Sequence, residues 1–251
     1  MMDAKYSIDE VPATPGYILR VFQDSHRQSA ASGNSDPDLQ LTHDTSIADW
    51  REGDDLLDWR RFAAAMNKEW NIDSPLDDWR NALEPAKART VGELCEFLAQ
   101  RTTAPRIRPL NIAGLACKSA GVFLSIRSLL ADAGADPNSI RPSARLDDYT
   151  RRYRSVFFGP ISRLAPGALP PVTIKKPVSD MGNVLVAATF LVAVISFVWV
   201  RHDRLFAIVA WIAVLASYIF TLFAARIGPS EVRFGSLKTF KDLSRLIAQS
   251  M

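Results

Sequence analysis

Cysteine and histidine are scarce in this sequence of 251 residues, which contains two cysteines and three histidines. Cys95 and Cys117 each lie in an apolar helical pattern with no second cysteine or histidine nearby, so we expect reduced core thiols in a cytosolic domain. The histidines, His26, His43 and His202, are too scattered for their spacing to define a metal site. The sequence therefore predicts neither a metal nor a cofactor.

Catalytic motifs are also missing. No Ser/His/Asp set, glycine-rich phosphate loop or His/Cys cluster is present at the spacing that such chemistry requires. The basic residues have no interleaved aromatic side chains on which single-stranded nucleic acid could stack. We therefore expect neither an enzyme nor a nucleic-acid-binding protein, and we predict no catalytic residue.

Acidic and basic residues are concentrated in different parts of the chain. Residues 1–100 contain 10 Lys/Arg and 19 Asp/Glu, whereas residues 101–179 contain 13 Lys/Arg and 4 Asp/Glu. The basic part suits contact with anionic lipid headgroups and the acidic part suits a basic protein partner, although both sets could simply solvate helix faces. The candidate lipid-contact residues are Arg151, Arg152, Arg154, Lys175 and Lys176.

Two long apolar runs, residues 181–200 and 205–225, contain no charged side chain and are separated by four residues. Helices of 20 and 21 residues would each span about 30 Å, the thickness of a bilayer's hydrocarbon core. We therefore expect a two-helix transmembrane hairpin over residues 181–226. Lys and Arg are concentrated on its flanks, which places both termini in the cytoplasm and makes the chain a two-pass membrane protein. A buried hairpin in a soluble protein is less favoured, because the apolar character surrounds each helix.

Small residues recur at helix-packing spacing within these runs. Such residues let helices approach closely in lipid, so they could close the hairpin on itself or join copies into a homo-oligomer. The predicted helix-packing residues are Thr189, Ala193, Ala213, Ser217, Thr221 and Ala225. Because neither run contains an ionisable side chain, we expect no proton relay or ion site there.

Helical periodicity dominates the rest of the chain after an irregular start at residues 1–15. Apolar residues three and four apart predict a firm helix from Asp54 to Trp70. Further helices are expected at 16–28, 75–83, 91–98, 112–133 and 146–164, before a proline-rich linker at 166–180. No run of alternating apolar residues predicts a strand. The expected class is therefore all-α, with small helical bundles and the transmembrane hairpin.

Two segments resemble each other. Residues 90–100 and 239–249 both begin with a Thr-x-x-acid capping box, Thr90 with Glu93 and Thr239 with Asp242, and share four inner apolar positions. Either this is a chance amphipathic match or the chain contains two copies of one helical unit. In the second case residues 110–165 form the second unit. The carboxyl-terminal segment, residues 227–251, then completes this unit, because its helix docks on residues 110–165.

The stretch from Gly16 to Arg101 also resembles an acyl-carrier-protein-like bundle. The resemblance is carried by Leu-Thr-His-Asp-Thr-Ser-Ile-Ala-Asp-Trp at 41–50, Gly-Asp-Asp-Leu at 53–56 and Thr-Val-Gly-Glu at 90–93. Asp55 stands where that family attaches phosphopantetheine to a serine, so the resemblance implies a relative without the prosthetic group. Asp54 and Asp55 are then expected to cap the helix that follows.

The leading functional hypothesis is a membrane-anchored, non-enzymatic interaction or scaffold module that binds a cytosolic protein. An accessory protein of acyl-chain or lipid metabolism is the first alternative, implied by fold analogy alone. An oligomeric channel or membrane-remodelling subunit is the second. The whole chain also resembles two-span bacterial inner-membrane proteins, a resemblance that implies no activity.

Overall fold

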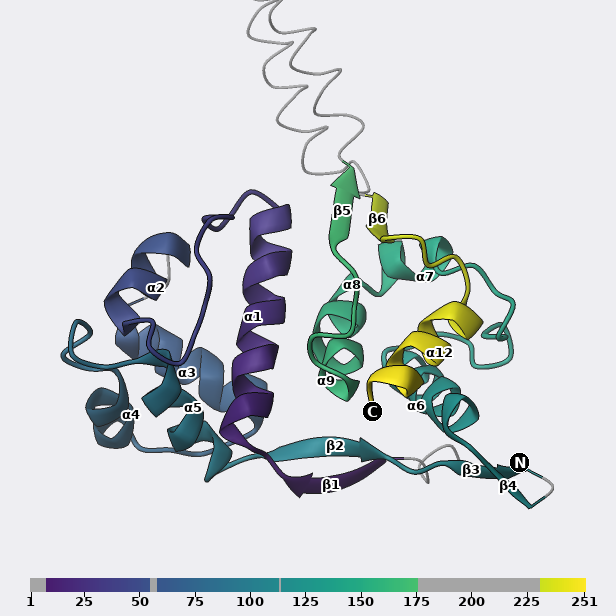
Figure 1. The fold of residues 1–251 in the computed structure, drawn as a ribbon, viewed down its shortest axis with the longest axis horizontal. Helices are drawn as coiled ribbons and strands as arrows, with labels where there is room; N and C mark the ends of the chain where they lie inside the picture. Colours follow the sequence, from purple (N-terminus) through teal and green to yellow (C-terminus); the bar gives the residue numbers. More distant parts are fainter. Residues whose placement is uncertain (1–7, 55–57, 113, 176–230) are drawn as a thin grey trace, which may run out of the picture. The chain divides into compact units, whose positions relative to one another are not determined.

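The computed structural model describes residues 8–54, 58–112, 114–175 and 231–251. The chain divides into two compact units, of which one comprises Met1–Thr173 with Arg233–Met251 and the other Ile174–Val232. Apart from β5 and β6, which extend into the second unit, the elements described below belong to the first unit. Within it, two related groups of helices follow one another along the chain (Figure 1).

The first group, called here the first repeat, contains five helices. They are α1 (Pro15–Ala31), α2 (Ile47–Asp54), α3 (Trp59–Trp70), α4 (Leu76–Leu83) and α5 (Val91–Ala99). Aromatic rings form a continuous line through its core. Centroid distances are 5.0 Å from Phe22 to Trp50, 5.7 Å from Trp50 to Phe62, 6.4 Å from Phe62 to Trp79 and 4.9 Å from Trp79 to Phe97. These large rings, of which only Phe97 is partly exposed, join all five helices.

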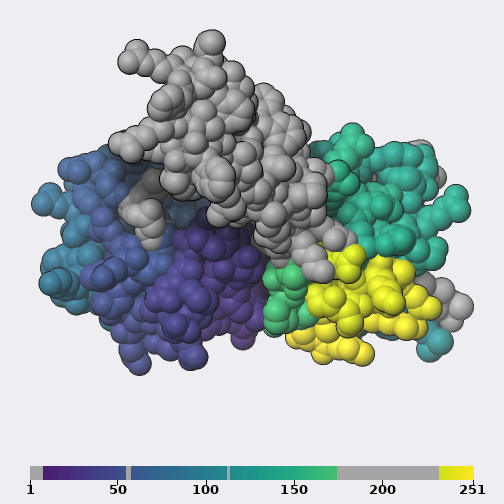
Figure 2. Space-filling model, turned by 90° about the horizontal axis from the view of Figure 1, so that it is seen from above, coloured from purple at the N-terminus to yellow at the C-terminus, as the bar shows by residue number. Residues whose placement is uncertain are grey.

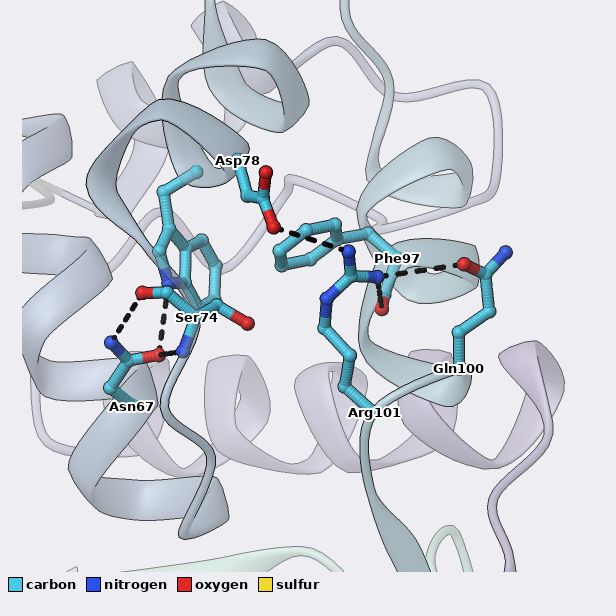
Figure 3. A network of polar contacts seen from close by, with 7 residues as sticks. Asn67, Ser74, Asp78, Phe97, Gln100 and Arg101 are labelled. Carbon is cyan, nitrogen blue, oxygen red and sulfur yellow. Dashed lines mark hydrogen bonds and ion pairs between the residues drawn. The ribbon is translucent and has the colours of Figure 1, made fainter.

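Polar contacts hold α3, α4 and α5 together at the edge of this core (Figure 3). The Asn67 amide donates to the Ser74 carbonyl at 3.0 Å and accepts from the Trp79 indole at 2.9 Å, which fixes the turn between α3 and α4. After α5, the Arg101 guanidinium donates to Asp78 at 3.4 Å and lies over the Phe97 ring. The hydrogen bond to Asn67 satisfies the buried indole N–H of Trp79, as a polar group in a core requires.

The second repeat begins with α6 (Lys118–Asp132) and ends with α12 (Phe240–Ser250), which packs against it. Between them lie α7 (Asp147–Arg152), α8 (Arg154–Val156), the π-helix η2 (Phe157–Ile161) and α9 (Ser162–Leu164). The fully buried side chains of α12 are Phe240, Leu243 and Ile247. In the space-filling view the yellow α12 lies beside the green and teal residues of the same repeat (Figure 2).

Corresponding backbone hydrogen bonds occur within each repeat. In each, a short loop pairs with the residues that precede the closing helix, α5 or α12. The isolated bridges are Ser46 with Thr90 and Arg145 with Thr239. The matching amide-to-carbonyl bonds are Ile47 to Arg89 at 2.8 Å and Leu146 to Lys238 at 2.9 Å, and Val91 to Thr45 at 2.9 Å and Phe240 to Ala144 at 3.3 Å. Both capping boxes are present, which confirms that prediction.

The all-α prediction is wrong, because the described residues also form three two-stranded sheets. Their strands are β1 (Ile8–Pro12) with β2 (Thr103–Ile107), β3 (Leu110–Ile112) with β4 (Leu115–Cys117), and β5 (Val172–Lys175) with β6 (Glu231–Phe234). The first pair is antiparallel, with Ile8 opposite Ile107 and Pro12 opposite Thr103. These strands are five residues or shorter, and such short strands give too little alternation to detect in the sequence.

Three predicted helix boundaries also differ. The helix expected from residue 112 begins at Lys118, because Gly114 has φ +83° and turns the chain into the β3–β4 hairpin. The helix expected over 146–164 is interrupted at Tyr153 and continues as a π-helix around Pro160. The helix expected from Asp54 begins at Trp59, and its N-cap is Asp58.

The predicted transmembrane hairpin requires a second correction of the fold class. Among the residues that the structure describes, no helix is both long enough and apolar enough to cross a bilayer. The hairpin was predicted within residues 181–226, which lie outside the described ranges. The three sheets correct the fold class to mixed helices and small sheets, and no helix of the described residues supports the two-pass inner-membrane localisation.

Candidate functional site

A cavity of about 730 Å³ lies along one face of α1. The floor is formed by α1 itself, from Arg20 to Ala31. One wall is the loop at residues 37–42, and the other is the segment at 167–172 that leads into β5. Two polar side chains of α1 tie these walls to the floor.

Asp24 is the more deeply buried of these two, with 4% of its surface exposed. Its carboxylate accepts hydrogen bonds from the Gly167 amide at 2.8 Å and the Ser162 hydroxyl at 3.2 Å, and it pairs with Arg27. On the opposite side, the Gln23 amide donates to the Leu41 carbonyl at 2.8 Å. Both walls are therefore held by specific contacts to α1 and the cavity is preformed.

His26 lines the same cavity and is 5% exposed. Its Nδ1 lies 2.6 Å from Oδ1 of Asp54, whose Oδ2 accepts from the Trp50 indole at 2.6 Å. Because an ionised carboxylate can only accept, Nδ1 carries the proton of this hydrogen bond. Nε2 is buried and has no hydrogen-bond partner among the described residues. One ring nitrogen is thus fixed by α2, while the other is enclosed by protein.

Arg20 adds a positive charge to the lining. It is exposed, and no ion pair or hydrogen bond of its guanidinium occurs within the described part of the chain. Its side chain passes close to Gly167, where a Cβ placed on that glycine would lie 3.6 Å from the Arg20 Cδ. By contrast, Arg27 is already paired with Asp24. Arg20 is therefore the cation of this lining that remains available to a ligand.

The two thiols occupy different environments. Cys95 is buried in α5, and burial, together with the nearby Glu96 charge, raises its pKa to about 12. Cys117 is only partly buried, contrary to the expectation of two core cysteines, and the Ser119 hydroxyl lowers the pKa of its thiol. Neither belongs to a group of metal-binding side chains, and no such group was found in the ranges that the structure describes.

The residues proposed from the sequence do not lie in this cavity. Arg151 and Arg152 are exposed on α7, Arg154 donates to the Ser32 hydroxyl at 3.2 Å, and Lys175 ends β5. Lys176 and the six small residues predicted to pack helices, Thr189, Ala193, Ala213, Ser217, Thr221 and Ala225, lie outside the described ranges, as does Asp55.

Sequence reasoning missed His26, Asp54 and Arg20 as site residues. A signal for His26 existed, since it follows Phe22 by four positions and therefore lies on the apolar stripe of α1. Asp54 was assigned to the start of the following helix, yet it is the last residue of α2 and lies one turn after Trp50. No sequence pattern marks Arg20 as a site residue, because the segment at 167–172 comes close to it only in the folded chain.

Comparisons with known proteins identify no relative. No family model matches the chain, and neither the curated proteins nor the solved structures gave a match. The function must therefore be inferred from the cavity and its side chains.

Proposed function

We propose that this protein is a non-enzymatic binding module whose ligand occupies the cavity over α1. The supporting observation is the preformed cavity, whose lining combines apolar residues with the polar side chains of Arg20, Asp24 and His26. A few polar groups in an otherwise apolar lining are typical of ligand-binding pockets. The cavity therefore favours an occupant with a polar group.

Binding is favoured over catalysis by the surroundings of the His26 imidazole. A His–Asp pair can serve as the base of a nucleophilic triad, but the nucleophile must then lie about 3 Å from the free nitrogen. Within the described residues Nε2 has no such neighbour. Thr42 also lines the cavity, but its hydroxyl is hydrogen-bonded to the Thr45 hydroxyl at 3.1 Å and is not a partner of Nε2.

The cavity also bears on the functional hypotheses from the sequence. It supports an interaction module without invoking a membrane anchor. For an acyl-chain accessory protein the lining is less suitable, because Arg20, Asp24, His26 and Arg27 favour a polar ligand over a hydrocarbon chain. The acyl-carrier resemblance of the first repeat remains a proposal about ancestry of the fold.

The test is a fragment screen on the purified full-length chain, followed by amide chemical shifts. Binders should shift residues 20–31, 37–42 and 167–172 together. Ala31→Trp places a large ring at an exposed position of the lining and should abolish binding, whereas Ala64→Trp on exposed α3 should not. The proposal fails if no fragment binds here, or if Ala31→Trp leaves binding at these residues unchanged.

A further inference from the structure

Each repeat presents one face that is formed by a loop and the start of its closing helix. The first-repeat face comprises residues 42–46 and 89–96, and the second-repeat face comprises the equivalent residues 141–145 and 238–245. We propose that these two faces bind each other between copies of the chain, which then associates head to tail. None of the charged residues of either face lines the cavity over α1, so this inference is independent of the proposed binding function.

The same hydrogen bonds build both faces. In the first, the Gly92 amide donates to the His43 carbonyl at 2.9 Å, and in the second the Lys241 amide donates to the Pro142 carbonyl at 2.8 Å. The isolated bridges and the capping boxes of the two repeats match in the same way. Side chains at equivalent positions of the two faces are therefore carried by the same local backbone.

The two faces nevertheless have opposite net charge. The first contains three acidic residues and one basic residue, whereas the second contains one acidic residue and five basic residues. The charged residues of the first face are Asp44, Arg89, Glu93 and Glu96. Those of the second face are Arg141, Arg145, Lys238, Lys241, Asp242 and Arg245. Each copy of the chain therefore carries both halves of an electrostatically complementary contact.

Two carboxylates of the first face are available to a partner. Glu93 is already paired with Arg89 at 3.3 Å and belongs to the capping box. Asp44 and Glu96 are exposed, and neither forms an ion pair within the described part of the chain.

On the second face the available cations lie close together. Arg141, Lys241 and Arg245 are exposed and form no ion pair with any described residue. Lys241 and Arg245 are separated by one turn of α12, so they lie on the same side of this helix. Arg141 directly precedes Pro142, whose carbonyl accepts from the Lys241 amide. The three positive charges thus form one patch.

A second copy of the chain fits this patch better than a nucleic acid or a bilayer does. The large apolar side chains of the second face, Phe240 and Leu243, are 0% and 1% exposed. The face therefore offers no ring on which bases could stack and no apolar side chain that could enter a bilayer. An acidic protein surface requires neither, and the first face of another copy supplies one.

The proposed contact is heterologous, because two different faces meet. Each junction leaves an acidic face at one end and a basic face at the other, so further copies can add. Charged contacts contribute to specificity and to the rate of association more than to affinity, and salt screens them. The association should therefore be reversible and sensitive to ionic strength.

The test is sedimentation velocity of the purified full-length chain. At about 0.01 M salt the average sedimentation coefficient should rise with protein concentration. At about 1 M salt it should fall, because the Debye length shortens from about 30 Å to about 3 Å.

Two variants each neutralise one face. The acidic-face variant combines Asp44→Asn and Glu96→Gln, and the basic-face variant combines Arg141→Gln, Lys241→Gln and Arg245→Gln. Each variant alone should lose the salt-sensitive association. Mixed together they should form a one-to-one complex and no larger one, because only one junction can form from the two intact faces.

Matched controls change the same number of charges elsewhere. Lys68→Gln, Arg80→Gln and Arg106→Gln together replace three exposed cations, and Asp73→Asn with Asp132→Asn replaces two exposed carboxylates. All five positions lie outside both faces, so both controls should associate as the unchanged chain does. Circular dichroism checks that every variant is folded.

Several results would overturn the inference. The unchanged chain could show no salt-sensitive association, either face variant alone could associate as strongly as the unchanged chain, or the mixture could form no complex. If the chain does not self-associate but binds vesicles of anionic lipid, and the basic-face variant does not, the basic face serves a membrane and the head-to-tail contact is wrong.

Discussion

Tyr17 is a buried phenol that links the first repeat to α9, because its hydroxyl donates to the Arg163 carbonyl at 3.1 Å. Burial raises its pKa to about 12, although the nearby Arg163 charge acts in the opposite direction. The folded value lies above the ordinary value of about 10, so the stabilisation is fully present below about pH 10 and is lost as the pH rises toward about 12.

Tyr17→Phe should therefore make the protein less stable near neutral pH, by about 1 kcal/mol for the lost hydrogen bond, and less sensitive to alkali. Urea unfolding at several pH values from about 8 to about 11 measures both effects. Cys95 also resists ionisation, but it is present in both proteins and cancels in the comparison. Equal loss of stability with pH in the two proteins would contradict the assignment to Tyr17.

The two thiols should differ in reactivity because the thiolate is the nucleophile. Iodoacetamide should alkylate Cys117, whose thiol pKa is lowered, at least about tenfold faster than buried Cys95 in the folded protein. The rate at Cys117 should rise with pH as the thiolate forms. Peptide mass spectrometry after timed quenching measures both sites, and addition of urea should remove the difference. Rapid native labelling of Cys95 would disprove its burial.

At the scale of elements, the matched capping boxes permit a paired experiment. Thr90 Oγ1 accepts from the Glu93 amide at 3.2 Å, and Thr239 Oγ1 accepts from the Asp242 amide at 3.3 Å. Thr90→Ala and Thr239→Ala should each lower the free energy of unfolding by about 1 kcal/mol, as removal of an N-cap does. Ser143→Ala, in an exposed loop, is the control. Urea titration that shows no loss for Thr239→Ala would mean that α12 contributes little to stability.

Local signals explain which elements could be predicted. The capping boxes of α5 and α12 and the short helix α4 after Pro75 depend on neighbouring residues, and they appear as expected. The pairing of β1 with β2 joins residues at Pro12 and Thr103, which no local window can connect. The His26–Asp54 contact is non-local in the same way, so only the fold reveals it.

At the scale of the whole molecule, both repeats belong to one compact unit. Side chains join them: Arg163 of α9 pairs with Glu69 of α3 at 2.5 Å, and the Ser162 hydroxyl donates to Asp24 of α1 at 3.2 Å. The capping-box alignment makes Leu94 of α5 and Leu243 of α12 equivalent, and they are 0% and 1% exposed.

We therefore expect the repeats to unfold together. Leu94→Ala and Leu243→Ala should each cost about 2–5 kcal/mol and shift one common transition, seen at equal denaturant by circular dichroism and tryptophan fluorescence. Four of the six tryptophans lie in the first repeat, so fluorescence reports on that repeat once Trp199 and Trp211 are replaced by phenylalanine in every variant. If Leu243→Ala lowers the helical signal at a denaturant concentration where fluorescence is unchanged, the repeats are independent.

The division of the second repeat along the chain has a consequence for the order of folding. Its closing helix begins at Phe240, far along the chain from the end of α6 at Asp132, whereas in the first repeat α5 begins at Val91, a shorter separation from the end of α1 at Ala31. Doubling the length of a loop costs only about 0.6 kcal/mol in closure entropy, so this interruption barely lowers equilibrium stability. Rates respond more strongly, because contacts between distant residues form late. The first repeat should therefore become protected from hydrogen exchange before the second, and α12 should be the last helix to acquire protection.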